Sequence, residues 1–292
     1  MRLANQQDVP GIVALAAAAG GSGRWGREQR TGPEHPDRRC HVEVEGDLIV
    51  GYGCVWRRKD TVFGLDAVVR PDHRGQGVGR RLLDQLFIDL ADFGATAVEA
   101  RVDADHKEAL VRMVRVGFIE LNRLERVRLD LDEVETSEPT LEGIDIRTLA
   151  EARDPDGLRA LDALVTAAFQ ARKLRQLEVF TETPNERFAA DLEAAPADGC
   201  FIASAAGVHV GFSGLTVGPE PGTLTAFMTA IAPGHRHRGI ATALKQRTIS
   251  YAKRNGYRAI FSNSPNRGMQ DLNELLGFKR AGSAEIRLGR RL

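Results

Sequence analysis

Two stretches of the chain, residues 68–83 and 230–244, repeat one pattern of apolar and polar positions. Each begins with a short apolar run, passes a proline and a basic loop that contains glycine, and continues with apolar residues at regular intervals. In the first copy these are Leu82, Leu83, Leu86, Phe87 and Leu90, and in the second they are Ile240, Ala243, Leu244 and Tyr251. Apolar residues three and four positions apart form the buried face of an amphipathic helix. The pattern therefore predicts a strand, a loop and a helix in both stretches.

The flanking segments follow the same order in both halves. Alternating apolar and polar residues around Gly46-Asp47 predict a β-hairpin, and a second hairpin is predicted around Ala206-Gly207. The other elements expected in the first half are a strand over 61–69, a strand over 97–102, a helix over 107–116 and a last strand that begins at Gly117-Phe118.

Landmarks of the first half recur in the second at a nearly constant distance. Gly211 lies 160 residues after Gly51, Arg236 lies 162 after Arg74, and Gly277-Phe278 lies 160 after Gly117-Phe118. Chance does not keep a hairpin, a loop and a helix end in step over half a chain, so we infer an internal duplication. The prediction is two domains, 1–135 and 144–292, joined by an acidic, proline-containing linker over 136–143.

The loop in each copy has the composition of a phosphate-binding loop. Gly75, Gly77 and Gly79 let the backbone turn and approach an anion, and the first turn of the following helix presents unpaired N–H groups. The spacing is not that of a dinucleotide fold, because a third glycine would fall on Arg80, and neither copy has the Gly-Lys-Ser/Thr of a Walker loop. The alternative is an ordinary strand-to-helix connection with surface arginines, which the repetition disfavours.

Composition excludes some classes of partner. The chain has 292 residues, enough for two domains, with 40 basic and 40 acidic side chains and a formal net charge of zero. A neutral chain has no general attraction to nucleic acid or to an anionic membrane, and no run approaches the roughly 20 apolar residues of a membrane span. The basic residues gather locally in the two loops, which favours a small polyanionic ligand.

The cysteines bear on the compartment. Cys40, Cys54 and Cys200 are separated and include no Cys-x-x-Cys pair, which predicts neither a disulfide framework nor a metal site and favours a reducing compartment. Cys54 and Cys200 lie in strand-like runs and are predicted to be small core residues. The N-terminal residues show no apolar stretch of signal-peptide length, so a cytoplasmic location is expected.

The order of these elements and motifs resembles the GNAT superfamily of acyl-CoA-dependent acyltransferases. The segments Arg74-Gly75-Gln76-Gly77-Val78-Gly79 and Arg236-His237-Arg238-Gly239-Ile240-Ala241 match its pyrophosphate loop, and the resemblance covers nearly the whole chain as two copies. It implies two tandem α/β (α+β) domains, each with a mixed, mostly antiparallel sheet flanked by helices and split near its middle. It also implies acetyl-CoA as the acyl donor.

The resemblance further implies which residues hold coenzyme A. They belong to the strand end and loop of each half and to one later helix: Val68, Val69, Arg74, Gly75, Gln76, Gly77, Val78, Gly79, Arg80, Ala230, Ile231, Arg236, His237, Arg238, Gly239, Ile240, Ala241, Thr242 and Asn266. In the family the strand also points an N–H at the thioester carbonyl, which polarises it as an amine attacks.

The catalytic residues are less well marked. The family's tyrosine acid, which protonates the departing thiolate, is replaced by Met113 in one half and by Asn273 in the other. Asp66 is a candidate general base, with Glu99 and Glu178 as weaker candidates, although a water chain can also remove the proton from the amine. Asn266 keeps the family's first asparagine, and its alternative role is to cap a helix.

We therefore expect transfer of an acetyl group to a primary amine of a small molecule. The favoured arrangement has one catalytic half, with the other half mainly structural, and the C-terminal half is closer to the family pattern. The competing hypothesis is a non-catalytic module that binds or senses acyl-CoA, since both halves lack the tyrosine. The duplication also predicts either a monomer with an internal pseudo-dimer or a homodimer.

Overall fold

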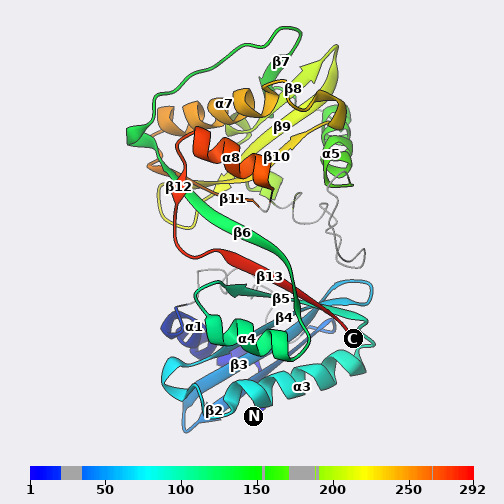
Figure 1. The fold of residues 1–292 in the computed structure, drawn as a ribbon, viewed down its shortest axis with the longest axis vertical. Helices are drawn as coiled ribbons and strands as arrows, with labels where there is room; N and C mark the ends of the chain where they lie inside the picture. The colour runs from blue at the N-terminus through cyan, green and yellow to red at the C-terminus, as the bar shows by residue number, and fades with distance from the viewer. Residues whose placement is uncertain (21–34, 153–154, 171–187, 189–190, 265) are drawn as a thin grey trace. The chain divides into compact units, whose positions relative to one another are not determined.

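The structure, a computed structural model, describes residues 1–20, 35–152, 155–170, 188, 191–264 and 266–292. The chain divides into two compact units (Figure 1). Unit 1 comprises Met1–Asn122 and Ile286–Leu292, and unit 2 comprises Arg123–Glu285. Each unit is described separately.

Unit 1 contains the elements predicted around the first loop. Its strands are β1 (Arg2–Leu3), β2 (Arg38–Glu45), β3 (Leu48–Lys59), β4 (Val62–Val69), β5 (Ala97–Asp103) and the C-terminal β13 (Glu285–Arg291). Its α-helices are α1 (Val9–Ala18), α3 (Val78–Asp92) and α4 (Lys107–Arg115), with short 3-10 helices over Gln6–Asp8 and Pro71–His73. The strands lie in the order β1-β2-β3-β4-β5-β13.

Unit 2 repeats this plan. Its strands are β6 (Ile119–Asp130), β7 (Asp145–Thr148), β8 (Phe201–Ala205), β9 (Val208–Val217), β10 (Thr223–Ile231), β11 (Ala259–Ser264) and the short β12 (Lys279–Arg280). Its α-helices are α5 (Pro155–Gln170), α7 (Ile240–Arg254) and α8 (Arg267–Leu275), with 3-10 helices over Leu131–Glu133, Ala197–Gly199 and Pro233–His235. The main strand order is β6-β11-β10-β9-β8-β7.

The two sheets share one pattern of strand directions. In unit 1 β2, β3 and β4 pair antiparallel and β4 pairs parallel with β5. In unit 2 β7 to β10 pair antiparallel and β10 pairs parallel with β11. A helix over 78–92 or 240–254 connects the two parallel strands, as a parallel crossover requires. The predicted fold class, two mixed and mostly antiparallel sheets with flanking helices, is confirmed.

Glycines on the central hairpin strands let the loop-bearing helices approach closely. A Cβ at Gly51 would lie 2.6 Å from a Val78 methyl, and one at Gly211 would lie 2.9 Å from an Ile240 methyl. The neighbouring residues Tyr52 and Phe212 belong to other clusters. Successive strand residues face opposite sides of a sheet, so each loop-bearing helix covers one face and the helix near the start of the unit covers the other.

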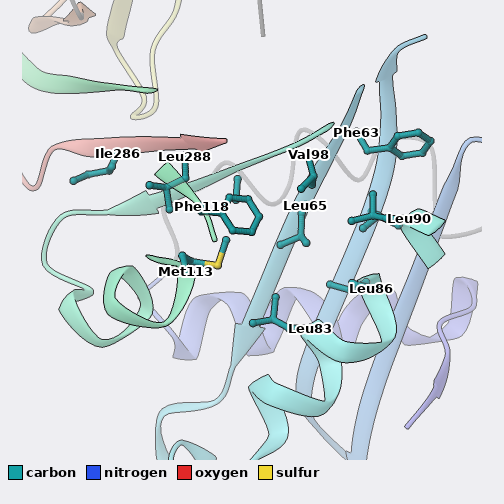
Figure 2. Packing of buried hydrophobic residues seen from close by; sticks show 12 residues of the cluster. Phe63, Leu65, Leu83, Leu86, Leu90, Val98, Met113, Phe118, Ile286 and Leu288 are labelled. Carbon is teal, nitrogen blue, oxygen red and sulfur yellow. The ribbon is translucent and has the colours of Figure 1, made fainter. Parts of the chain in front are cut away.

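The main core of unit 1 is apolar throughout. It gathers buried side chains from α3, β4, β5 and α4, and Figure 2 shows Leu83, Met113 and Phe118 lying together among them. Met113, which stands where the family has its tyrosine, is a core residue, since its side chain is 6% exposed.

The cysteine prediction was wrong for one pair. Cys40 and Cys54 face each other on β2 and β3 and form a disulfide. The two cysteines are 14 residues apart in the sequence, and only the register of the hairpin brings their Cα atoms within 4.1 Å. Cysteine spacing alone therefore did not predict the pair. Cys200 is a free buried thiol, and burial raises its pKa to about 11, which fits the predicted core role. The argument from cysteines for a reducing compartment is therefore lost, and the compartment stays a prediction.

The units differ from a simple division of the chain at the predicted linker. Unit 1 takes the C-terminal residues 286–292, and unit 2 already begins at residue 123, with β6 paired to β11. The predicted domains 1–135 and 144–292 therefore remain a prediction about the duplicated sequence. Within the described ranges, no helix has the length and apolarity needed to cross a membrane.

Candidate active site

Both loops hold the same unusual backbone. In unit 1 Gly75 and Gly77 have φ of 79° and 83°, and in unit 2 His237 and Gly239 have φ of 62° and 77°. These values are left-handed, a region open to glycine and unfavourable for most other residues. His237 occupies it where unit 1 has a glycine, which places local backbone strain in the second loop. Each loop then enters its helix through the left-handed glycine, Gly77 or Gly239, at the N-cap.

Each loop leaves a row of backbone N–H groups for an anion. The amides of Arg80 and Arg81 bond back to the Gly77 carbonyl, and that of Ala243 bonds back to Gly239. Within the described part of the chain, the amides of residues 75–79 and 237–241 have no protein acceptor. Unpaired amides at a helix N-terminus, with the helix dipole behind them, suit a phosphate group. The loops therefore have a backbone that suits the diphosphate of coenzyme A, and their contact with the cofactor stays a prediction.

The charged side chains of the unit 1 loop are engaged with protein acids. Arg81 bonds Glu43 at 2.8 Å, Arg70 pairs with Asp72, and His73 lies 2.8 Å from Asp72, which raises the pKa of His73 and lowers that of Asp72. These ion pairs neutralise much of the positive charge that the loop offers a ligand.

The basic side chains of the unit 2 loop make fewer contacts with acidic residues. Arg236 makes one long bond to the Ile231 carbonyl, at 3.5 Å, and Arg74 makes the equivalent bond to Val69 at 3.3 Å in unit 1. Among the described residues, His235, His237 and Arg238 have no acidic partner. The second loop thus keeps its positive side chains available.

In both units the parallel strand pair separates before the loop. β4 pairs with β5 only from Val62 to Leu65, and β10 pairs with β11 only from Thr223 to Ala226. The strand ends beyond these residues, 66–69 and 227–231, keep only their antiparallel partner. They include Val68, Val69, Ala230 and Ile231, the residues predicted to pair with the pantetheine arm. The split predicted from the resemblance is therefore present in both units.

Among the described residues, a β-bulge at the split occurs only in unit 2. Ala226 opposes Leu215 and Met228 opposes Gly214, so Phe227 is an extra residue without a partner on β9. In unit 1 the equivalent residues Leu65 and Asp66 oppose Val55 and Cys54 without interruption. A bulge bends its strand and redirects the backbone groups beside it.

The bulge has a local cause in packing. The Phe227 ring lies 6.0 Å from Phe188 and 6.1 Å from Phe212, measured between ring centroids. A Cβ at Gly214 would lie 2.6 Å from the Phe227 ring and 2.7 Å from Phe212, so only glycine leaves room there. The residue of unit 1 at this register is Cys54, whose side chain is bonded to Cys40. Glycine in one copy admits the extra ring, and cysteine in the other fills that position.

Comparison with known proteins identifies the family. The model of the acetyltransferase (GNAT) family matches residues 21–118 and 160–278, one match for each loop-containing half. The chain belongs to the GNAT family. Its members transfer an acyl group to an amine, and this GNAT chain carries the family's machinery twice.

Relatives in sequence match both halves of the chain. The chain is 31% identical to a mycothiol acetyltransferase of Tsukamurella paurometabola, with 82% of this chain and 80% of that protein covered. It is 27% identical to a mycothiol acetyltransferase of Streptomyces avermitilis, with 87% and 80% covered. Both names agree with the acetyl transfer expected from the sequence.

Solved structures support the fold. A GCN5-related N-acetyltransferase from Sphaerobacter thermophilus superposes with a TM-score of 0.79 at 21% identity, covering 99% of this chain and 94% of that one. A tandem GNAT protein from the clavulanic acid biosynthesis pathway gives a TM-score of 0.69 at 18% identity, covering 98% and 95%.

The predicted general bases of this GNAT chain differ in their surroundings. Asp66 is half-buried on β4 opposite Cys54 and already interacts with other protein groups. Glu99 is 4% exposed and bonds Arg287 at 2.8 Å and also Arg58, so its carboxylate is neutralised by two arginines within unit 1. That network explains Glu99 as a structural ion pair. Glu178 lies outside the described residues.

Asn266 caps a helix. Its side-chain oxygen accepts the N–H of Gly268 at 2.9 Å at the start of α8. In unit 1 His106 holds the equivalent place at the start of α4 and makes no such bond. The capping role that the sequence left as an alternative is thus present, and the contact with coenzyme A stays a prediction.

Asn273 is buried and lacks a partner. Its side chain is 1% exposed, and no described residue bonds its Oδ1 atom. A buried polar atom without a partner costs free energy unless a ligand or water satisfies it. Asn273 replaces a tyrosine that the family uses, so its orphaned oxygen marks this position as one of the most unusual in unit 2.

Lys245 is a second buried polar residue near this position, and sequence reasoning missed it. Its side chain is 2% exposed on α7, and its ammonium lies 5.2 Å from the centre of the Phe278 ring. Burial lowers its pKa to about 8. A signal was available: the offset of 162 that relates Arg236 to Arg74 places Lys245 at the position of Leu83, on the apolar face of the first helix. A lysine on the buried face of a duplicated helix was the anomaly to notice.

Proposed function

We propose that unit 2 catalyses transfer of an acetyl group from acetyl-CoA to a primary amine of a small molecule, and that unit 1 is mainly structural. The observation that carries this proposal is the bulge at Phe227, which lies in unit 2 where β10 leaves β11. The split strand edge must present backbone N–H groups to an acyl carbonyl, and a bulge is the device that redirects such groups.

The chain's own groups divide the work as follows. The amides of residues 237–241 and the guanidinium of Arg238 would hold the diphosphate, with Ile240 and Thr242 in the first turn of α7. Ala230 and Ile231 would align the pantetheine arm along the open edge of β10. Acetyl-CoA supplies the activated acyl group when bound, and the protein contributes position and a polarised carbonyl.

Unit 1 is assigned the structural role for matching reasons. Its strand runs through the split without a bulge, its loop arginines are paired with acids, and its core at Leu83 and Met113 is apolar. In addition, the Arg112 guanidinium lies 3.1 Å from where a Cβ of Gly79 would be, beside the first turn of α3. The residues Gly75, Gln76, Val78 and Arg80 still form a phosphate-type loop, and binding of coenzyme A there without turnover is compatible with this role.

The amine that mycothiol acetyltransferases acetylate is the first acceptor to test, because two such relatives cover four fifths of their length with this chain. The competing function is an acyl-CoA sensor without turnover. It is favoured by the absence of the family's tyrosine acid from both halves.

Two measurements test the proposal: calorimetric titration with acetyl-CoA reports binding, and thiol release reports turnover. Gly239→Glu places bulk and negative charge in the unit 2 loop, and Gly77→Glu is its matched control in unit 1; both glycines are left-handed, so the backbone strain is the same. We expect Gly239→Glu to abolish thiol release with an amine panel while Gly77→Glu retains it. Loss of turnover in Gly77→Glu alone would assign catalysis to unit 1. Binding without turnover on any amine would support the sensor.

A further inference from the structure

The two units differ at one buried position that the family pattern does not explain. In unit 1 Leu83, Met113 and Phe118 belong to one apolar cluster (Figure 2). The equivalent residues of unit 2 are Lys245, Asn273 and Phe278. Two apolar side chains have thus become a cation and a carboxamide, while the phenylalanine is kept.

Both residues contact the same phenylalanine, Lys245 through its side chain and Asn273 through its backbone. The Lys245 ammonium lies 5.2 Å from the Phe278 ring centre, and the backbone carbonyl of Asn273 accepts the Phe278 N–H at 2.9 Å. Both side chains are almost fully buried. Asn273 Oδ1 has no bonding partner, and among the described residues Lys245 has no acidic partner either.

The helix geometry turns Lys245 toward the split strands. Ile240 and Leu244 face Gly211 of β9, within about 3 Å of where its Cβ would lie. The next residue along a helix is rotated by about 100°, so Lys245 points away from β9, and its contact with Phe278 shows that it points toward the α8 side. In unit 1 Leu83 shares its cluster with Leu65 of β4 and Val98 of β5, the last paired region before the split. Because Lys245 corresponds to Leu83 by the offset of 162 residues, we place its ammonium near the point where β10 and β11 separate.

A buried cation without a counter-ion is costly, and a protein that keeps one gains something in return. The ring face of Phe278 attracts the ammonium but carries no formal negative charge. An anion that enters the split between the strands would supply the missing counter-ion.

We infer that Lys245 is the proton donor to the departing thiolate of coenzyme A, in place of the tyrosine that this chain lacks. This rests on the proposed acetyl transfer in unit 2. As the amine nitrogen bonds to the acyl carbon, the carbon–sulfur bond breaks and its electron pair stays on sulfur. Lys245 Nζ passes one proton to that sulfur and becomes neutral. The attacking nitrogen loses one proton to solvent, and Lys245 regains one from solvent, so the proton count closes.

The pKa of Lys245 suits this role. Its pKa of about 8 keeps it protonated at neutral pH and close to the range in which thiols ionise. Burial is the cause of the lowered pKa, and no carboxylate or other charged group of the described residues contributes to it. Asn273 and Phe278, its neighbours from α8 and the following segment, are neutral.

Titration of the thiol of bound coenzyme A tests the inference without an acceptor amine. The ultraviolet absorbance of the thiolate is followed against pH for free coenzyme A, for the wild-type complex and for the Lys245→Leu complex. Lys245→Leu copies the residue that unit 1 carries at this position. Lys253→Met, which removes an exposed lysine from the same helix, is the matched control.

We expect the bound thiol to ionise at lower pH in the wild type and in Lys253→Met than in Lys245→Leu, by on the order of one pH unit, since an adjacent ammonium stabilises a thiolate. An unchanged thiol pKa in Lys245→Leu, with coenzyme A still bound, would overturn the inference and leave the proposed function intact. Failure of the wild type to bind coenzyme A would overturn both.

Turnover provides a second measurement. With an accepted amine, Lys245→Leu should lower kcat by on the order of 10²-fold and change the KM for acetyl-CoA only a few-fold. Lys245→Leu/Asn273→Tyr, which restores the family's acid, should recover much of kcat. Equal kcat and an equal pH profile in wild type and Lys245→Leu would show a merely structural lysine.

Discussion

Units 1 and 2 share a fold but differ in the pairing of their most deeply buried charged side chains. In unit 1 the buried charges are paired within the protein: Glu99 with Arg287 and Arg58, and Asp89 with His41 at 2.7 Å and with Arg39. In unit 2 Lys245 and Asn273 are buried without such partners among the described residues. Satisfied polar groups stabilise a scaffold, whereas unsatisfied ones are available to a ligand. The difference is in the direction that the proposed division, with unit 1 mainly structural and unit 2 catalytic, predicts.

The strands at the split also differ between the two units. A disulfide-bonded cysteine at the register of Cys54 keeps β4 regular, while glycine at position 214 admits the ring of Phe227 and the bulge. A single residue on the neighbouring strand thus separates the two geometries.

The largest expected effect comes from breaking the buried ion network of unit 1. Glu99→Leu leaves Arg287, which is 4% exposed, without its counter-ion and should destabilise the protein by about 3–5 kcal/mol. Chemical denaturation measures this loss. Asp271→Ala, which removes an exposed i,i+4 pair with Arg267, is the control and should cost under about 0.5 kcal/mol. If Glu99→Leu also abolished acetyl transfer at temperatures where it is folded, unit 1 would be more than a scaffold.

Removing the buried cation of unit 2 by Lys245→Leu should stabilise the protein, in contrast to the loss expected for Glu99→Leu. The pKa of Lys245 falls from 10.5 to about 8 on folding, so the unfolded chain holds more protons between these values. The cost is fully present below pH 8, on the order of 3 kcal/mol, and is relieved as the pH rises toward 10.5. The free energy of unfolding of the wild type should therefore increase with pH relative to that of Lys245→Leu. Parallel curves from pH 7 to 10.5 would show that the lysine is not desolvated.

A methyl group at the bulge should have an intermediate effect. Gly214→Ala forces a contact of 2.6 Å with the Phe227 ring, and overpacking of this kind costs about 1–3 kcal/mol. We also expect weaker acetyl-CoA binding at unit 2, because relief of the contact moves the bulge. Gly53→Ala is the control in unit 1, where the added Cβ meets only a Leu86 methyl at 3.0 Å. Equal affinity in Gly214→Ala and Gly53→Ala would remove the bulge from the binding argument.

The smallest effect concerns the helix that follows the split. Asn266→Ala removes the cap on Gly268 and should cost about 1 kcal/mol, seen as faster hydrogen exchange over 267–275. His106→Asn adds a capping residue at the same place in unit 1 and should slow exchange over 107–115. A change in coenzyme A affinity beyond this stability loss would support the predicted second role of Asn266.

Local patterns carried much of the prediction. The two glycine loops, the helices after them and the hairpins before them follow from residue spacing within short windows, and the structure places them as expected. The phosphate loops were predictable because their chemistry lies in consecutive residues, 74–80 and 236–242.

The remaining features depend on pairings between distant residues. The bulge required the register of β9 against β10, the disulfide required that of β2 against β3, and Arg287 reaches Glu99 across 188 positions of the chain. Their effects cannot be read from a local window, since a shift of one residue reverses which side chains face the core.

The sequence by itself determined the duplication, the fold class of each half and the two phosphate loops, because local propensity and spacing are sufficient for these. The tertiary structure alone decided that β4 stays regular opposite the disulfide-bonded Cys54, whereas β10 bulges opposite Gly214. It also decided that the ammonium of Lys245 lies over the ring of Phe278, 33 residues further along the chain. Burial removes water from these side chains, and only the folded packing sets which of them find a partner.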